Sequence, residues 1–284
     1  MQIGTTLRQI RKNRNMTQKQ LTEGLLKQAT YSRIENGQLE CEAAMLAQLV
    51  ERLNISLHEF FYIHQNYQAT NRQKLIQTFT RMELTPLHEI TEQMELIQQY
   101  LNNNCDQDIQ MLYYAYESLK ELVETNQLHN VRAAAKQVWS YMQQLDHWYI
   151  NDLELLNSII LYFPLDIAKE ISNTALRRLN AYKEFEKDVT YLKLYFRLNL
   201  TTLYLEEQSF EVCLQELNDI HLAFQKTLTY QSLGFIYVRK IVCKYYLKQA
   251  FEMEMQHYNM LKQLFHDEAA FELLDSELVL NEII

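Results

Sequence analysis

Ten basic or polar side chains near the N-terminus are of the kinds that contact nucleic acid. Gln28 can pair bidentately with adenine, and Arg33 or Lys27 can reach guanine or a phosphate. The basic side chains before residue 20 cluster where phosphates would run. The ten candidates are Arg8, Arg11, Lys12, Arg14, Gln18, Lys19, Lys27, Gln28, Thr30 and Arg33.

The surrounding residues predict the short helices that would position these side chains. Apolar residues between positions 3 and 10 recur at helical spacing. Thr17 is a good N-cap with Gln20 as its capping-box partner, so a second helix begins there and runs to about residue 25. A third helix is predicted over residues 28–36, and Gly37 supplies the left-handed conformation that ends it.

Two more helices complete the predicted N-terminal domain, residues 1–65. One spans residues 43–53, and Ser56 caps the other, in which Leu57, Phe60 and Phe61 would close the core. The second and third helices read as a helix-turn-helix, whose latter helix lies in the major groove of DNA and presents its N-terminal side chains to base edges. The alternative is a helical bundle whose surface is merely basic.

Composition supports an all-α protein with a basic head. The 284 residues include only 4 Gly and 2 Pro, too few for the many turns of a strand-rich fold. Residues 1–39 carry seven Lys/Arg and two Glu, a net charge of +5; the whole chain is −9, which leaves −14 for residues 40–284. This asymmetry is expected when only the head contacts phosphate.

The rest of the chain repeats with a period of 42 residues. Residues 66–85 read as a linker and connecting helix, and residues 86–284 as helical repeats. Tyr162, Tyr204 and Tyr246 are each 42 residues apart, and a second apolar-periodic helix follows each of them. Paired helices at this period predict an α-solenoid similar to tetratricopeptide (TPR) repeats.

Stacked helix pairs form a groove lined by the first helix of each pair. Asparagine side chains there could bind the backbone amides of an extended peptide, and arginine could bind a carboxylate. The alternative is that the tyrosines pack in the core and the arginines are solvated. The candidate peptide-binding residues are Asn157, Tyr195, Arg197, Asn199, Tyr237 and Arg239.

The head resembles the xenobiotic-response-element/Cro-like helix-turn-helix family. Thr17-Gln18-x-x-Leu21 and Ser-Arg-Ile-Glu-Asn-Gly at residues 32–37 match its pattern, with one residue fewer between Thr17 and Ser32. That shorter turn resembles the Rgg/GadR/MutR group of transcriptional regulators, as do residues 54–61, 152–157 and 235–239 of this chain.

This resemblance implies a function for both domains. In the group, a homodimer binds promoter DNA, and the repeat domain binds a short secreted signalling peptide, as in quorum sensing. The group often has a cysteine that can bridge the two protomers; its place falls at Ala43 here, and Cys41 is two residues away. An intersubunit disulfide is therefore left open.

Other functions are less consistent with the sequence. No Ser/His/Asp grouping, Gly-rich phosphate loop or HExxH motif is present, so no enzyme, metal site or cofactor is expected. No stretch of 18 apolar residues occurs, and a cytoplasmic protein that does not enter a membrane is expected. Two alternatives remain: a repeat domain that serves as a protein-docking or dimerisation scaffold, and a response to pH through His147, His221 or His257.

Overall fold

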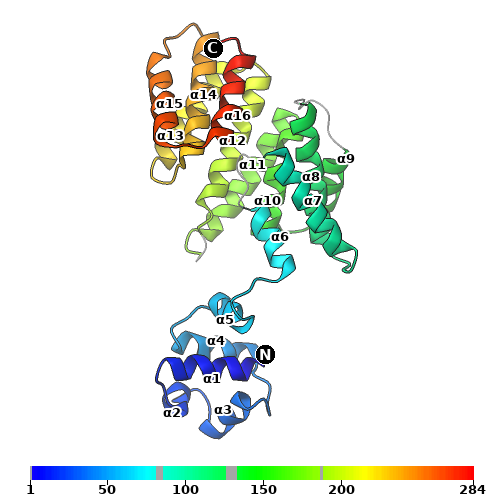
Figure 1. Ribbon diagram of the computed structural model, residues 1–284, viewed down its shortest axis with the longest axis vertical. Coiled ribbons are helices and arrows are strands. Elements are labelled where there is room, and N and C mark those ends of the chain that lie inside the picture. The colour runs from blue at the N-terminus through cyan, green and yellow to red at the C-terminus, as the bar shows by residue number, and fades with distance from the viewer. Residues whose placement is uncertain (1, 81–85, 126–132, 186–187) are drawn as a thin grey trace. The chain divides into compact units, whose positions relative to one another are not determined.

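The computed structural model describes residues 2–80, 86–125, 133–185 and 188–284, and within them it contains helices and no strand (Figure 1). The predicted all-α class is confirmed. The helices are α1 (Ile3–Asn13), α2 (Gln18–Thr22), α3 (Gln28–Glu35), α4 (Ala43–Arg52), α5 (Leu57–His64), α6 (Asn71–Phe79), α7 (Leu87–Leu101), α8 (Gln107–Thr125), α9 (Ala133–Met142), α10 (Ile150–Ile159), α11 (Leu165–Leu179), α12 (Thr190–Glu206), α13 (Phe210–Phe224), α14 (Tyr230–Tyr246), α15 (Glu252–Leu264) and α16 (Glu268–Leu280). Two short 3-10 helices, η1 (Ile160–Tyr162) and η2 (Asn180–Tyr182), follow α10 and α11.

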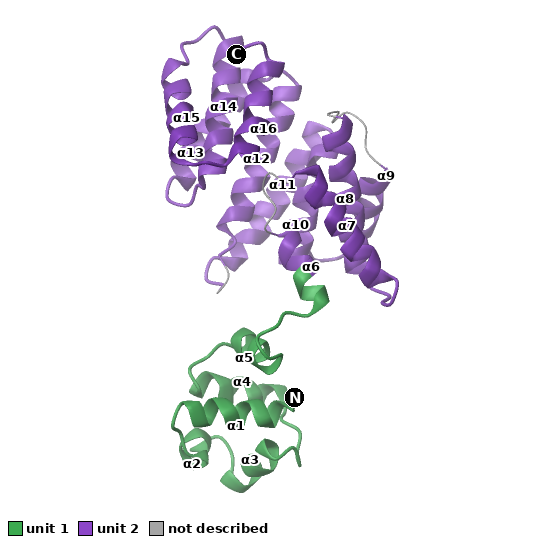
Figure 2. Ribbon diagram, in the orientation of Figure 1, with its two compact units in different colours: residues 1–74 green, residues 75–284 purple. Residues whose placement is uncertain are grey.

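The chain divides into two compact units, residues 1–74 and 75–284 (Figure 2). The division falls within α6, because Leu75 and Phe79 of that helix are buried in the core of the C-terminal unit. The connecting helix thus ends as part of the repeat domain. Residues 81–85 of the linker expected over 66–85 lie outside the described residues.

Short-range signals set the helix ends of the N-terminal unit. Thr17 and Gln20 form the predicted capping box, and Ser56 Oγ accepts a hydrogen bond from the backbone N–H of Glu59. Helix α2 ends at Thr22 rather than near residue 25, because the chain turns there and the Leu25 N–H bonds to the Thr22 carbonyl. Each cap satisfies a backbone group that the helix leaves unpaired.

The last helix of the N-terminal unit, α5, buries one side chain where three were predicted. Phe60 is fully buried, whereas Leu57 and Phe61 are 42% and 41% exposed. The prediction that Leu57 and Phe61 close the core is wrong. Only one face of this short helix packs against α1 and α4. Phe61 is rotated by about 100° from Phe60 and leaves that face, and Leu57 is the first residue of the helix, at its exposed end.

Helix pairs build the C-terminal unit. Helices adjacent in the chain pack on one another from α7 to α9 and again from α11 to α15, and α10 packs on α8, α9 and α12. The three repeated tyrosines lie near the ends of the first helices α10, α12 and α14, and each is followed by the second helix of its pair. They are Tyr162 in η1 after α10, Tyr204 two residues before the end of α12, and Tyr246 at the end of α14. The predicted repeat arrangement is confirmed.

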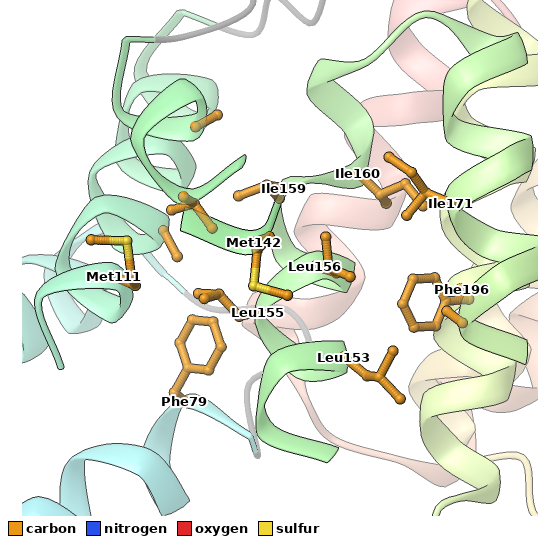
Figure 3. Close-up of a cluster of buried hydrophobic side chains, with 14 of the residues drawn as sticks. Phe79, Met111, Met142, Leu153, Leu155, Leu156, Ile159, Ile160, Ile171 and Phe196 are labelled. Carbon is orange, nitrogen blue, oxygen red and sulfur yellow. The ribbon is translucent and has the colours of Figure 1, made fainter. Parts of the chain in front are cut away.

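The core of the C-terminal unit runs from repeat to repeat as neighbouring clusters of buried side chains. The largest includes Phe79 of α6, Leu153 of α10 and Phe196 of α12, which Figure 3 shows among side chains from several helices. Two smaller clusters continue it through α12–α14 and α14–α16. Each helix pair thus buries its apolar face only against its neighbours, as in other solenoids.

The final helix, α16, folds back on α14. Phe271, Leu274 and Leu278 are buried on the side that packs, whereas Leu273 and Leu280 are exposed. The apolar C-terminal stretch therefore caps the last repeat with one face and leaves apolar side chains on the other. None of the described helices is long and apolar enough to cross a bilayer.

Candidate functional site

A buried ion pair holds the helix-turn-helix together. Arg11 Nε and Nη2 donate to the two carboxylate oxygens of Glu35 at 2.7 and 3.1 Å, and Arg11 Nη1 donates to the Met16 carbonyl at 2.6 Å. Gln18 Nε2 donates to Glu35 Oε2 at 2.7 Å. The side chains of Arg11 and Glu35 are only 10% and 2% exposed. This bidentate pair joins α1, the turn after it, α2 and α3.

The ion pair also shifts the protonation of its members. Burial raises the pKa of the Glu35 carboxyl, but the hydrogen bonds from Arg11 and Gln18 outweigh burial and leave that pKa below its ordinary value. The hydrogen bond to Glu35 likewise raises the pKa of Arg11. Both groups are therefore charged at neutral pH, and the positive charge of Arg11 is neutralised inside the unit.

Two glycines set the position of α3. A Cβ on Gly4 would lie 1.8 Å from the carbonyl oxygen of Ile34, so α1 approaches α3 more closely than any other residue would allow. Gly37 has φ of +69° and ends α3, with the Gly37 N–H bonded to the Ile34 carbonyl and the Gln38 N–H to the Arg33 carbonyl. The predicted left-handed cap is confirmed.

The structure leaves most of the ten candidate DNA-binding side chains in solvent. Gln18 and Thr30 are half-buried, and Arg11 is buried against Glu35, so its guanidinium is turned into the unit instead of facing phosphate. Lys27 is the N-cap of α3 and Gln28 its first residue, which places both at the end that would meet base edges. The exposed candidates are Arg8, Lys12, Arg14, Lys19, Lys27, Gln28 and Arg33.

The C-terminal unit contains a cavity of about 250 Å³. Its walls combine apolar and aromatic side chains with amides and hydroxyls, the mixture typical of ligand sites. The lining residues are Phe79, Thr80, Ala115, Leu119, Glu154, Asn157, Ser158, Leu161, Tyr195, Leu198, Asn199, Gln231, Ser232 and Phe235.

First helices of successive pairs supply most of this lining. Helices α8, α10, α12 and α14 contribute to it, together with residues at the end of α6 and in η1. Three of the six candidate residues, Asn157, Tyr195 and Asn199, lie in the cavity wall. Asn199 Nδ2 donates to both Oδ1 and the backbone carbonyl of Asn157 at 3.1 Å. The structure therefore brings these two amides together at one point of the wall.

The other three candidates, Arg197, Tyr237 and Arg239, do not line the cavity. On α12, Tyr195 and Asn199 share a face, and Arg197 lies on the opposite one because each residue turns the helix by about 100°. There Arg197 Nε donates to Glu216 Oε1 of α13 at 2.6 Å. Tyr237 similarly packs against the rings of His221 and His257.

Arg239 is buried between three helices. Its Nη1 donates to the hydroxyls of Thr201 and Thr202 on α12 at 2.9 and 2.6 Å, and its Nε lies 3.3 Å from Glu277 Oε1 on α16. The guanidinium also lies 3.7 Å from the centre of the Phe235 ring. Arg239 thus connects a wall of the cavity to the last helix, with its charge balanced by Glu277.

The 42-residue offset holds for one pair of neighbouring helices and fails for the next. Asn157 and Asn199 are 42 residues apart and in direct contact. Tyr237 follows Tyr195 by 42 residues and is not in the cavity wall, whereas Gln231 of α14, which follows Tyr195 by 36 residues, is. The shift is about one to two helical turns. Because α14 is offset in this way, Tyr237 and Arg239 do not line the cavity as the sequence predicted.

Glu154 is a lining residue that the sequence analysis missed. It is 7% exposed, and the Tyr191 hydroxyl donates a hydrogen bond to Glu154 Oε1. Its position one helical turn before Asn157 was the available signal, because residues i and i+3 share a face of a helix. Phe79, Gln231 and Phe235 had no such signal, since their place depends on the packing of α6 and α14.

Comparison with known proteins supports both units. The helix-turn-helix family model HTH_3 matches residues 7–60. No curated protein is a significant match to this sequence.

Solved structures match over nearly the entire chain. A protein of Listeria monocytogenes EGD-e described as a transcriptional regulator has a TM-score of 0.75 at 15% identity, with 99% of each chain covered. PlcR of Bacillus thuringiensis, in complex with the peptide PapR7 and DNA, has a TM-score of 0.68 at 18% identity, covering 98% of this chain and 99% of its own. The SHP pheromone receptor Rgg2 of Streptococcus dysgalactiae has a TM-score of 0.61 at 15% identity, with 99% of each covered.

The resemblance to the Rgg group that the sequence indicated is confirmed at the level of domain and fold. Residues 7–60 are a helix-turn-helix domain of the HTH_3 family, and the chain as a whole has the fold of the PlcR and Rgg2 regulators.

Proposed function

We propose that this chain is a sequence-specific DNA-binding transcriptional regulator whose C-terminal unit binds a short signalling peptide. The helix-turn-helix supports the first part: α3 begins with exposed Lys27 and Gln28, and exposed basic side chains flank it on α1 and α2. Gln28 reads a base edge, and Lys12 and Lys19 contact phosphates. The role requires no catalysis, and we expect none.

One observation carries the peptide-binding part, the cavity lined by amide and apolar side chains on successive first helices. Asn157 and Asn199 can donate to and accept from the backbone of an extended peptide, while Leu161, Leu198 and Phe235 bury its apolar side chains. PlcR, which shares this fold, is described in complex with a peptide and DNA.

The regulator acts as a homodimer in this proposal. A single helix-turn-helix offers few base contacts, and twofold pairing doubles them and fixes the spacing of half-sites. The exposed apolar side chains of α16, among them Leu273 and Leu280, support this assignment. The peptide then controls the promoter by binding one arrangement of the dimer better than another.

The test measures both activities on the full chain. Selection of DNA from a random duplex library would yield an operator, and pools of synthetic heptapeptides would be scored for saturable binding. Asn199→Ala should weaken peptide binding about fivefold to tenfold and leave operator affinity unchanged, because it removes one amide contact. Asn218→Ala, an exposed asparagine on α13, is the matched control and should change neither.

Two results would contradict the proposal. A protein that selects no DNA sequence would not be a regulator of this kind. A protein that binds an operator, but no peptide pool, would keep the DNA-binding role and lose the receptor role, and the repeat domain would then be a docking scaffold.

A further inference from the structure

A cluster of titratable side chains joins α13, α14 and α15. His221 lies on α13, Tyr237 and Lys240 on α14, and His257 on α15. The Tyr237 ring packs against both imidazoles, with its centre 5.7 Å from that of His221 and 5.2 Å from that of His257. Burial raises the pKa of the Tyr237 phenol, which therefore stays neutral near neutral pH. None of the four is among the described residues that line the cavity, so the proposed ligand site does not account for them.

One polar contact in the cluster joins Lys240 to His221. Lys240 Nζ lies 3.3 Å from His221 Nδ1, and Lys240 is only 6% exposed. An ammonium group can only donate, so this hydrogen bond needs an imidazole whose Nδ1 carries no proton. A neutral His221 with its proton on Nε2 meets that requirement. A protonated His221 would present a second donor and a second positive charge to the buried ammonium group.

Two charged neighbours act on Lys240. Burial lowers the pKa of Lys240, Glu254 of α15 opposes that shift, and Lys244 of α14 adds to it. The Glu254 carboxylate also accepts a hydrogen bond from Lys244 Nζ at 2.6 Å, so this carboxylate serves two ammonium groups. A charged His221 would add a third cation to this group.

These surroundings lower the pKa of His221. Burial is the largest cause, and the charges of Lys240 and His257 add to it. On the other flank of α13, Arg197 of α12 is paired with Glu216. An imidazole released into solvent by opening of α13 would return to the ordinary value of 6.5. The neutral contact therefore contributes its full stability above that value, and the contribution is lost as the pH falls below 6.5.

We propose that the contact between His221 and Lys240 is an acid-sensitive device, which holds α13 against α14 near neutral pH and loosens in mild acid. The ligand of this device is a proton, and its response requires no peptide. It goes beyond the proposed function and does not depend on it. Because α13 packs on both α12 and α14, its loosening gives the repeat unit an input of its own, the acidity of the surrounding solution.

The experiment measures amide hydrogen exchange of the full-length protein at pH 7.5 and 5.5, with rates corrected for intrinsic exchange. In the wild type, opening of α13 and of the facing part of α14 should increase about fivefold to tenfold at the lower pH. Exchange in α7, α8 and α9, which lie outside the cluster, should change less than about twofold. His221→Gln keeps an acceptor for Lys240 but does not titrate, so it should lose the increase.

Two histidine variants serve as controls. His147→Gln removes an exposed imidazole before α10 and should keep the full increase. His257→Gln should keep most of it, because the charge of His257 is the smallest of the three causes that act on His221. An increase that is lost in His257→Gln and kept in His221→Gln would overturn the proposal, since His257 would then be the sensor.

A second measurement gives the pKa of His221 directly. In protein labelled with isotopically enriched histidine, the His221 signal is assigned by its absence from His221→Gln, and its NMR titration should give a pKa below 6.5. Lys240→Met should raise that pKa, because it removes the neighbouring charge. A wild-type value of 6.5 or higher, or exchange in α13 that does not respond to pH, would overturn the device and leave the proposed peptide binding untouched.

Discussion

Each unit of this protein buries an arginine against a glutamate, but the two pairs are built differently. In the N-terminal unit, Arg11 and Glu35 bond through two atoms each, and Glu35 is almost completely enclosed. In the C-terminal unit, Arg239 spreads its contacts over α12 and α16, and the side chain of its partner Glu277 is 25% exposed. The first pair closes a small core, whereas the second joins helices of a solenoid through a partly exposed glutamate.

The difference matches what each unit must do. The helix-turn-helix must hold one geometry to read DNA, so its internal charge is neutralised and its positive charge lies on the exposed side chains around α3. In the proposed function the repeat unit admits a ligand, and Glu154 is the one charged side chain among the described residues that line its cavity. Arg11 is turned toward Glu35 and Arg239 does not line the cavity, so neither buried arginine lies at a proposed binding site.

The largest expected effect is on unfolding free energy, and it should differ between the two ion pairs. Glu35→Ala leaves Arg11 buried without a counter-charge and should cost the N-terminal unit about 3–5 kcal/mol of unfolding free energy. Glu277→Ala should cost about 1–2 kcal/mol, because Arg239 keeps its threonine partners. Amide hydrogen exchange in α1–α3 and in α14–α16 of the full chain measures the two losses separately. Equal losses would remove the distinction drawn between the pairs.

The next effect concerns DNA recognition by α3. Gln28→Ala should lose about 1–3 kcal/mol of discrimination at one base pair of the operator while non-specific affinity is kept. Competition binding against operators substituted at each position measures this loss of discrimination. Gln48→Ala, an exposed glutamine on α4, is the control. A loss that is uniform over all base pairs would assign Gln28 to phosphate contact instead.

A smaller effect should follow from pH. The folded-state pKa of Glu35 lies below its ordinary value of 4.5, so its stabilising contribution is complete above that value and is lost as the pH falls through the lowered pKa. Exchange protection of α1–α3 should therefore decrease as the pH falls below 4.5. Glu35→Gln has no such titration, and its protection should change less over the same range. An identical decrease in both proteins would place the titrating group elsewhere.

The smallest expected effect is on the salt dependence of DNA affinity when single surface charges are removed. Lys19→Gln should reduce the slope of log affinity against log salt concentration by about 0.9, the value for one phosphate contact. Lys193→Gln, in the C-terminal unit, should leave the slope unchanged. Affinity for a random duplex measured at several salt concentrations suffices. An unchanged slope in Lys19→Gln would mean that this side chain does not reach phosphate.

The sequence predicted features that depend on near neighbours. The capping box at Thr17 and Gln20, the left-handed cap at Gly37 and the pairing of first and second helices are all set within a few residues of the chain, and the structure has each of them. The 42-residue repeat also relates Asn157 and Asn199, whose side chains are in direct contact because α10 and α12 are stacked at that period. The all-α class followed from composition alone.

Features that depend on partners far along the chain were not predictable in the same way. Arg11 belongs to a basic run, and only the approach of Glu35 turns it inward. Arg239 follows Arg197 at the repeat period, but α14 is stacked at a shorter offset, which no local pattern records. Phe79 and Gln231 line the cavity only because α6 and α14 pack beside α10 and α12 there.

Because glycine has no side chain, α1 packs tightly against α3 at Gly4, and this contact bears on which promoters the protein can recognise. Since the backbone of α1 contacts the Ile34 carbonyl directly, the tight packing prevents α3 from tilting or rotating independently of α1. We expect the preferred half-site to be the same with and without ligand. A signal would then alter how long or at what separation two half-sites are occupied, so target promoters should differ in spacer length and not in half-site sequence.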